Sequence, residues 1–299
     1  MARKLNKILL LILKLVVSSS LLYLVLSKAG AEKVFTIIKT INPVAFIGVI
    51  FIHLASLYVS SIRWRLLLPE EFKGKRLFSF YLIGSFFNTF LPGIVGGDAV
   101  KTYYLYKETN KGSLSFASVF MDRYIGFISL MTIALISFAV GFKYVKGSLI
   151  EWLLPLIVFS FLIGSFVIFR LRLGKGIKAL SEFYGYFREY SRQKMVLIKT
   201  LMLSCAIQVM AILSMYIIAW GLGQHIYLSY FFIFFPIIVT ISTLPISISG
   251  IGLREGAFVL LFGMAGVKPE MATAMSFAWF LSTASGGLVG LFEYLRLKT

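Results

Sequence analysis

At two places in the apolar sequence, charged residues follow a Leu-Pro pair and several glycines. The first segment, LPGIVGGDAVK at 91–101, carries Asp98 and Lys101. The second, LPISISGIGLREGAF at 244–258, carries Arg254 and Glu255. Ionisable side chains are costly inside a bilayer, so those found there are functional candidates by default. Arginine holds a phosphate through two parallel hydrogen bonds, which predicts that Arg254 contacts a lipid phosphate.

Each candidate also has a structural interpretation. Asp98 could cap a helix N-terminus, with Lys101 one turn later as its ion-pair partner. Arg254 and Glu255 could form a buried structural pair, although adjacent helical positions point about 100° apart and are not expected to pair only with each other. Asp122 and Arg123, in SVFMDRYIGF, could line a site or mark the cytoplasmic end of a span. Asn88 could bridge broken backbone or touch a substrate.

The prolines and glycines explain how the chain could break within a membrane. A proline cannot continue a helix, and glycines allow a turn and close backbone approach. The helix that restarts would direct free N–H groups and its positive dipole end into a polar cavity, where an anion fits. The residues assigned to the two breaks are Pro92, Gly93, Gly96 and Gly97, and then Pro245, Gly250 and Gly252.

The composition identifies an integral membrane protein. Of 299 residues, 59% are hydrophobic and only 14% are charged. The net charge of +18 does not indicate nucleic acid, because the basic residues lie at the ends of apolar runs, where lipid headgroups are. Cys205 is the only cysteine, so neither an intrachain disulfide nor a cysteine-based zinc site can form.

Six apolar runs are long enough to cross a bilayer as helices. They lie at about 8–27, 44–62, 116–142, 149–169, 197–221 and 272–295. The first resembles a signal peptide but is too long and is interrupted by Lys14, so we expect it to be retained. Lysine and arginine are concentrated before the first span, at 63–76 and at 170–199, which predicts cytoplasmic N- and C-termini in the cell membrane.

The two broken stretches, 77–107 and 230–266, are predicted to be re-entrant helical hairpins that enter from opposite sides. The fold is then an all-α membrane domain, residues 1–299, with six full spans and two hairpins. Half A, about 5–147, and half B, about 148–297, would form an inverted-topology repeat, in which discontinuous helices build a substrate site near the midplane.

Other polar residues have simpler interpretations. Arg63, Trp64 and Arg65 are typical of an interfacial belt, with contact to headgroup phosphates as the alternative. The basic and aromatic segment 171–199 is predicted to be an amphipathic connector at the cytoplasmic interface. His53 is a single imidazole without a motif partner, so we expect neither a metal site nor a cofactor.

Three motifs in this order, GSFFNTFLPGIVGGDAVK, VFMDRYIG and TLPISISGIGLREGAF, resemble the membrane domain of bacterial lysylphosphatidylglycerol synthases/flippases over residues 5–296. The resemblance implies a lipid-translocating domain whose motifs line the lipid path. The soluble domain that attaches lysine to the lipid has no counterpart here, so synthase activity is not implied, and a polyprenyl-phosphate lipid is an alternative cargo. The matching positions are Asn88, Pro92, Gly96, Gly97, Asp98, Asp122, Arg123, Pro245, Gly250, Gly252, Arg254 and Glu255.

The sequence therefore predicts a flippase, not an enzyme, that moves a phosphate-bearing lipid through a cavity between the hairpins. The predicted substrate contacts are Asn88, Asp98, Lys101, Asp122, Arg123, Arg254 and Glu255. The alternatives are an intramembrane lipid-phosphate enzyme that uses Asp98, Asp122 and Glu255 with a divalent metal, and a lipid-binding scaffold for a glycosyltransferase. The predicted partners are membrane lipids, with a separate lipid-modifying enzyme and oligomer formation left open.

Overall fold

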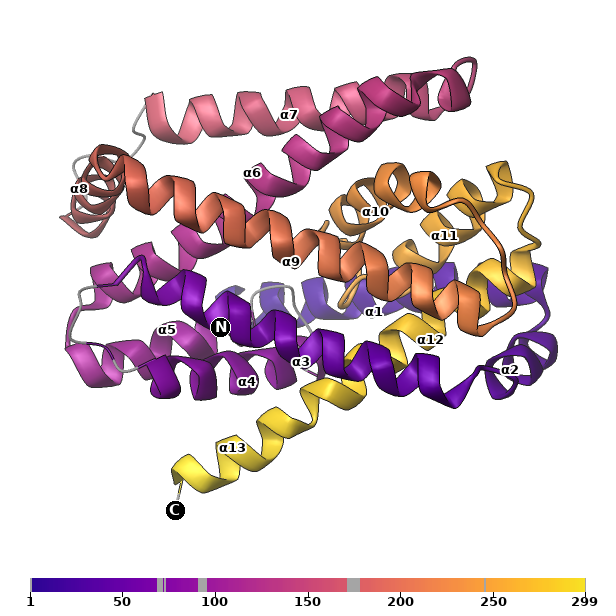
Figure 1. Ribbon diagram of the computed structural model, residues 1–299. Helices are drawn as coiled ribbons and strands as arrows, with labels where there is room; N and C mark the ends of the chain where they lie inside the picture. Colours follow the sequence, from indigo (N-terminus) through magenta and orange to yellow (C-terminus); the bar gives the residue numbers. More distant parts are fainter. Residues whose placement is uncertain are drawn as a thin grey trace. The chain divides into compact units, whose positions relative to one another are not determined.

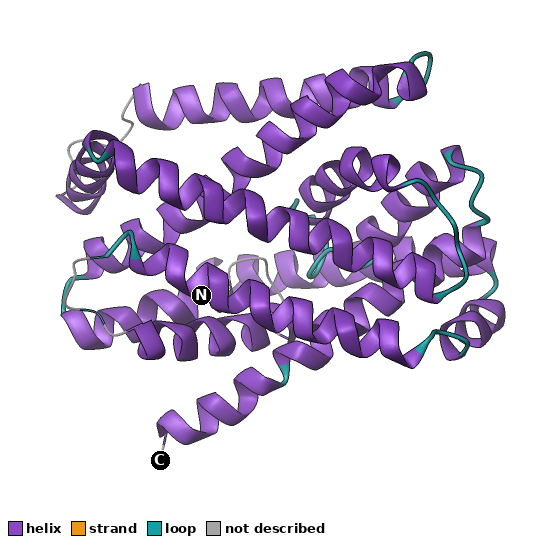
Figure 2. Cartoon of the chain, in the orientation of Figure 1, coloured by secondary structure: helices purple, strands orange, loops and turns teal. Residues whose placement is uncertain are grey.

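The computed structural model describes residues 2–68, 72, 74–90, 96–170, 178–244 and 246–298, and these residues form α-helices joined by short loops, with no strand (Figures 1 and 2). The helices are α1 (Ala2–Ala29), α2 (Ala31–Lys39), α3 (Pro43–Arg65), α4 (Gly74–Phe90), α5 (Gly96–Thr109), α6 (Gly112–Val145), α7 (Ile150–Arg170), α8 (Lys178–Arg192), α9 (Lys194–Gly221), α10 (Leu228–Ser242), α11 (Leu253–Met264), α12 (Pro269–Gly287) and α13 (Val289–Lys298). The all-α prediction is confirmed.

Six helical stretches in the described part of the chain are long and apolar enough to cross a bilayer, and each overlaps one predicted span. They are Ile12–Ala29, Pro43–Arg65, Gly112–Lys143, Ile150–Arg170, Lys194–Gly221 and Pro269–Leu297. Each contains at least the 18 or so residues that about 30 Å of hydrocarbon requires. The protein is therefore a multi-pass membrane protein.

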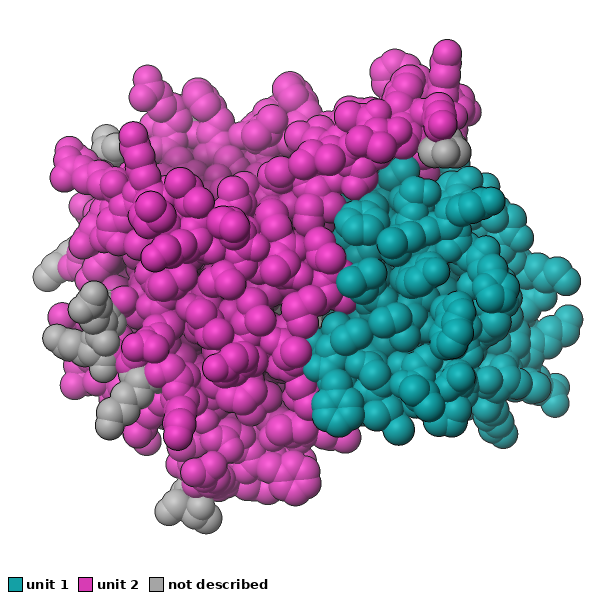
Figure 3. Space-filling view, in the orientation of Figure 1, with its two compact units in different colours: residues 1–53, 88–96, 212–286 teal, residues 54–87, 97–211, 287–299 magenta. Residues whose placement is uncertain are grey.

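The chain folds into two compact units, shown in teal and magenta in Figure 3. Unit 1 contains residues 1–53, 88–96 and 212–286, and unit 2 contains residues 54–87, 97–211 and 287–299. Both units thus contain sequence from before and after residue 147. The division into half A and half B, and the inverted repeat, stay predictions.

In unit 2, α4 and α5 form an antiparallel pair, as the broken stretch 77–107 predicts (Figure 1). Arg76, near the start of α4, forms a salt bridge with Glu108, near the end of α5. The Phe80 ring, one turn further along α4, stacks on Tyr104 with 5.3 Å between centroids. Contacts therefore pair the start of α4 with the end of α5, so the two helices run in opposite directions.

In unit 1, α10 and α11 also pack against each other and run in opposite directions. Phe231, in the first turn of α10, contacts Phe262 near the end of α11, with 5.1 Å between ring centroids. The loop between them has a left-handed backbone at Ser249, Gly250 and Gly252, with φ of 51°, 75° and 83°. Two of these positions are the predicted break glycines, which reach such φ values without a Cβ clash. The re-entry of either hairpin into a bilayer stays a prediction.

Two helices lie outside both the predicted spans and the predicted hairpins. The segment 171–199 contains α8, whose Phe183 and Tyr190 are buried while Arg188 and Arg192 are exposed, so its helix is amphipathic as predicted. Tyr190 donates a hydrogen bond of 2.8 Å to the Leu67 carbonyl, and burial raises the pKa of its phenol. The short helix α2 was not predicted, because its nine residues are too few to cross a bilayer.

We expect Gly84→Ala to destabilise the α4–α5 hairpin. A Cβ at Gly84 would lie 2.9 Å from Lys101 Cγ and 3.1 Å from the Gly97 carbonyl oxygen, closer than packed atoms allow. The Lys101 stem cannot swing aside, since its ammonium group is held by an ion pair with Asp98. Overpacking of this kind costs about 1–3 kcal/mol. Thermal unfolding in detergent should show a lower midpoint than for the wild-type protein.

The matched control is Gly164→Ala in α7, where a Cβ would have nothing within 4 Å. Alanine favours a helix over glycine by about 1 kcal/mol, so this control should be neutral or stabilising. An equal response of the two variants would contradict the close approach of α4 and α5.

Candidate functional site

Six polar residues from four helices meet inside unit 2. We call them the Asp122 cluster: Arg63 of α3, Tyr81 of α4, Asp98 and Lys101 of α5, and Asp122 and Arg123 of α6. Four of them, Asp98, Lys101, Asp122 and Arg123, are predicted substrate contacts. The structure brings these four together and adds Arg63 and Tyr81.

Asp122 lies at the centre of the cluster with only 1% of its surface exposed. Its Oδ1 accepts a hydrogen bond of 2.8 Å from Arg63 Nε. Its Oδ2 accepts a hydrogen bond from the Tyr81 hydroxyl and lies 3.7 Å from Lys101 Nζ. A carboxylate buried this deeply needs such cationic and hydrogen-bonding partners, because burial without them would cost several kcal/mol.

Asp98 connects the buried Lys101 to the partly exposed Arg123. It lies in the first turn of α5, where the helix dipole favours a negative charge. Its Oδ1 is 3.0 Å from Lys101 Nζ, which is the ion pair of the structural interpretation. Its Oδ2 is 2.5 Å from Arg123 Nε. The Lys101 ammonium thus bridges both carboxylates, and it also lies 4.2 Å from the centroid of the Tyr81 ring.

The formal charges of the cluster do not cancel. Arg63, Lys101 and Arg123 contribute three positive charges, and Asp98 and Asp122 contribute two negative charges. One positive charge is left over. Arg123 is the most exposed of the five, with 35% of its side chain accessible, whereas the other four side chains are less than 10% exposed. The surplus charge is therefore accessible at Arg123.

The interpretation of Arg63 and Trp64 as part of an interfacial belt is wrong, because both are buried. Only 6% of the surface of Arg63 is exposed, and its Nη1 donates a 2.9 Å hydrogen bond to Ser204 in addition to its contact with Asp122. Trp64 is fully buried and donates to Ser118, so it does not form an interfacial belt either. Arg65 is exposed and fits that prediction. The three residues do not share one environment, because consecutive helical side chains face different sides of α3.

The second predicted pair forms another polar group in unit 1. We call it the Glu255 cluster: Gly252, Arg254, Glu255, Ser276 and Phe280. Glu255 Oε1 accepts from Arg254 Nη2 at 2.5 Å and from Ser276 at 3.2 Å. Its Oε2 accepts from the Gly252 backbone N–H at 2.7 Å, which satisfies a donor at the start of α11.

The Glu255 cluster is compact and its charges balance. Glu255 has none of its surface exposed and Arg254 has 6%. Arg254 also donates from Nε to Ser276 at 3.1 Å and lies 4.5 Å from the centre of the Phe280 ring. As predicted, the two charged residues do not pair only with each other. Their geometry fits the structural interpretation, because it fixes the turn that precedes α11.

The remaining predicted residues occupy the two breaks. Asn88 lies in the last turn of α4 and is partly buried, and Gly96 and Gly97 begin α5. At Gly252 a Cβ would lie 2.6 Å from Leu21 Cβ, so glycine there permits close packing of α1. Pro92, Gly93 and Pro245 lie outside the described residues.

The geometry of the two clusters does not favour a metal-dependent lipid-phosphate enzyme. That hypothesis needs Asp98, Asp122 and Glu255 to converge on one ion. In the structure both aspartates accept from cationic side chains, and the surplus positive charge of the Asp122 cluster would repel a divalent cation. Glu255 already accepts from three donor groups. No group of three potential metal ligands is found among the residues that the structure describes.

Comparisons with known proteins place this chain near other membrane proteins. A family model described as "Lysylphosphatidylglycerol synthase TM region" matches residues 11–290. A curated relative, "UPF0104 membrane protein" from Methanothermobacter thermautotrophicus, is 23% identical over 280 residues, and the match covers 82% of each chain. The family match therefore includes both clusters, five of the six candidate spans in full and the sixth up to residue 290.

Proposed function

We propose, because this chain belongs to the lysylphosphatidylglycerol synthase TM region family, that it moves a phosphate-bearing lipid between the leaflets of the cell membrane. That family consists of membrane domains associated with lipid flippase function. The cargo we propose is a phospholipid, an aminoacyl-lipid or a polyprenyl-phosphate-linked lipid. Non-enzymatic transport, cytoplasmic termini and membrane lipids as partners are further parts of the proposal.

One observation carries the proposal: the surplus positive charge of the Asp122 cluster. Three cations and two carboxylates lie within direct contact distances of one another, mostly shielded from solvent. A phosphodiester headgroup carries one negative charge, so its arrival would neutralise the cluster. In a low-dielectric site such neutralisation is far more favourable than in water.

Arg123 is the residue we propose to receive the phosphate. It is partly exposed, and its guanidinium can hold two phosphate oxygens at once. If phosphate replaces Asp98 as its partner, Asp98 keeps the Lys101 ammonium at 3.0 Å. The exchange therefore leaves no carboxylate unpaired. Such a reversible change of partner lets a headgroup bind and then leave.

The Glu255 cluster has a different role in this proposal. Its charges balance and its acceptors are occupied, so it holds the start of α11 in place. A phosphate contact of Arg254 would first require this ion pair to open. The cavity predicted between the two hairpins stays a prediction. A lipid-binding scaffold would bind the same headgroups without moving them, and a transport measurement separates the two functions.

Reconstituted vesicles test the proposal. We expect the purified full chain, in liposomes that contain head-labelled phosphatidylglycerol, to expose inner-leaflet label to externally added dithionite. The fraction of quenched label should rise above the fraction in protein-free liposomes. A second set of vesicles should carry a labelled polyprenyl phosphate, since both cargo classes are proposed.

The negative control is the double variant Asp98→Asn/Glu255→Gln, which removes one carboxylate from each cluster and retains hydrogen-bond acceptors at both positions. Its folded state should be checked by thermal unfolding before transport is compared. If the wild-type chain moves neither lipid faster than protein-free liposomes do, transport is not its function. Retained binding without movement would instead support the scaffold.

A further inference from the structure

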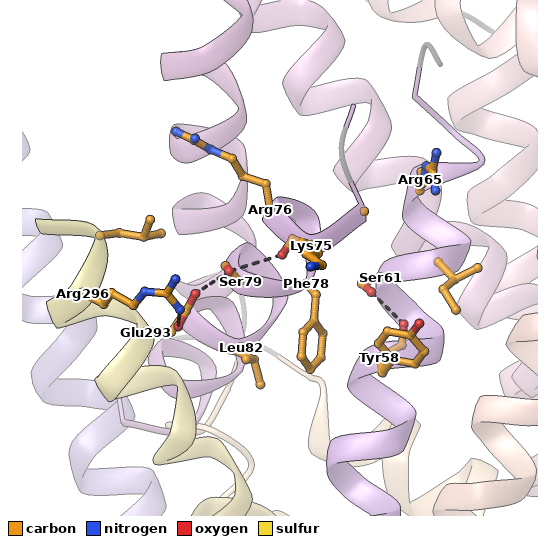
Figure 4. Close-up of a pocket in the computed structure, with 13 residues that line it drawn as sticks. Tyr58, Ser61, Arg65, Lys75, Arg76, Phe78, Ser79, Leu82, Glu293 and Arg296 are labelled. Carbon is orange, nitrogen blue, oxygen red and sulfur yellow. Dashed lines mark hydrogen bonds and ion pairs between the residues drawn. The ribbon is translucent and has the colours of Figure 1, made fainter. Parts of the chain in front are cut away.

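A pocket of about 770 Å³ opens in unit 2 between α3, α4 and α13 (Figure 4). We call it the basic pocket. Its cationic lining residues are Arg65 at the end of α3, Lys75 and Arg76 at the start of α4, and Arg296 in α13. These residues differ from those of the Asp122 cluster, so the pocket is a separate feature.

The lining of the basic pocket is strongly positive. Its single carboxylate among the described lining residues is Glu293, against four cationic side chains. Glu293 accepts a 2.5 Å hydrogen bond from Ser79 and lies 3.6 Å from Arg296, so it is already engaged (Figure 4). Arg76 pairs with Glu108 outside the pocket. Arg65 and Lys75 are exposed. An anion therefore finds more positive than negative charge here.

Apolar side chains form the other part of the lining. Ile62, Phe78 and Leu82 continue from the basic residues along α3 and α4 toward the middle of these helices. A charged end beside an apolar wall matches an amphiphilic ligand, whose headgroup and acyl chain need different surroundings. Basic pockets between transmembrane helices are a known way to bind anionic headgroups.

Two arginines near the end of α3 point in different directions, one into the buried cluster and one into the basic pocket. Residues two apart on a helix point to nearly opposite sides. Arg63 accordingly faces Asp122, whereas Arg65 faces the basic pocket. The end of α3 thus supplies one cation to each place.

We propose that the basic pocket binds the phosphate headgroup of an anionic membrane lipid, with the acyl chain against Ile62, Phe78 and Leu82. Arg65 and Lys75 hold the phosphate. The site does not depend on transport, since it shares no residue with the Asp122 cluster.

Photolabelling of the full chain in nanodiscs tests this site. The probe is phosphatidylglycerol with a diazirine in one acyl chain, diluted in phosphatidylcholine, and labelled peptides are identified by mass spectrometry. We expect labelling at Ile62, Phe78 or Leu82. Arg65→Gln/Lys75→Gln should raise the probe concentration needed for half-maximal labelling. The increase should be roughly 5-fold for each cation removed, about 25-fold in all.

The matched control is Arg188→Gln/Arg192→Gln in α8, which removes two exposed arginines away from the pocket lining. It should label like the wild-type chain. Thermal unfolding in detergent verifies that both double variants are folded. Because Arg65 and Lys75 are exposed and form no salt bridge within the described part of the chain, their removal should leave the unfolding midpoint unchanged.

Two further probes identify the ligand. Diazirine-labelled diacylglycerol, which lacks the phosphate, should not label these residues above background. Excess inorganic phosphate should compete only weakly, because it cannot use the apolar wall. Equal labelling by diacylglycerol, or no loss of labelling in Arg65→Gln/Lys75→Gln, would overturn the proposed lipid site. Full competition by inorganic phosphate would show a site for a soluble anion and overturn it as well. Transport by a chain that fails these tests would leave the proposed function intact.

Discussion

Asp122→Ala is expected to lower the free energy of unfolding by about 3–5 kcal/mol, the typical cost of removing one partner of a buried ion pair. Asp122 is 1% exposed, and its carboxylate contacts Arg63, Tyr81 and Lys101. Without it, two cations remain buried with too little negative charge around them. A cost of this size is a large fraction of the stability of most proteins. Thermal and denaturant unfolding in detergent should show a much lower midpoint.

Two variants make the prediction specific. The double variant Arg63→Met/Asp122→Leu removes both charges of the 2.8 Å ion pair. It should therefore lose less stability than Arg63→Met and Asp122→Leu lose in sum. Glu108→Ala is the control for loss of a carboxylate from a more exposed pair, and its cost should be about 1 kcal/mol or less. Additive losses at Arg63 and Asp122 would contradict a coupled buried pair.

The spans and breaks of this fold could be predicted because each depends on local sequence. A run of about 20 apolar residues has few alternatives to a membrane helix. Glycine favours a break through its own backbone geometry, and Gly250 and Gly252 have left-handed φ values in the loop between α10 and α11. The Asp98–Lys101 pair is also local, since residues three apart share one helix face.

The complete Asp122 cluster could not be predicted in the same way. Arg63 and Asp122 are 59 residues apart, and Tyr81 and Asp122 are 41 apart. Their contact depends on how α3, α4 and α6 are rotated about their own axes, and this rotation is determined by packing between helices. Tyr81 sits among other aromatic residues of α4, so the sequence does not distinguish it from a core residue. A signal was present at Arg63, which directly follows a long apolar run.

The Arg254–Glu255 pair has a local structural role, and its contact with a substrate stays a prediction. Glu255 accepts the Gly252 N–H three residues earlier, the spacing expected of a residue that satisfies an N-terminal helix donor. The same spacing is visible in the sequence, GLRE, and favours the structural interpretation.

Arg123→Gln is expected to slow lipid movement by roughly 10- to 100-fold, the effect of losing a charge-assisted hydrogen bond to a phosphate. The substitution removes the accessible surplus charge and the paired donors of the guanidinium. Stability should change by about 1 kcal/mol or less, because the side chain is 35% exposed and an ion pair at such a site contributes little. The dithionite assay and thermal unfolding measure the two effects on the same preparation.

Arg123→Lys separates charge from geometry. Lysine restores the positive charge but presents a single ammonium in place of a planar fork, so its rate should lie between those of Arg123→Gln and the wild-type chain. The exposed Arg188→Gln in α8 should keep the wild-type rate, which excludes a general effect of net charge on the vesicles. If Arg123→Gln moves lipid at the wild-type rate, the phosphate does not exchange with Asp98 at this residue. The surplus charge of the cluster would then have to act through Lys101, whose ammonium contacts both carboxylates.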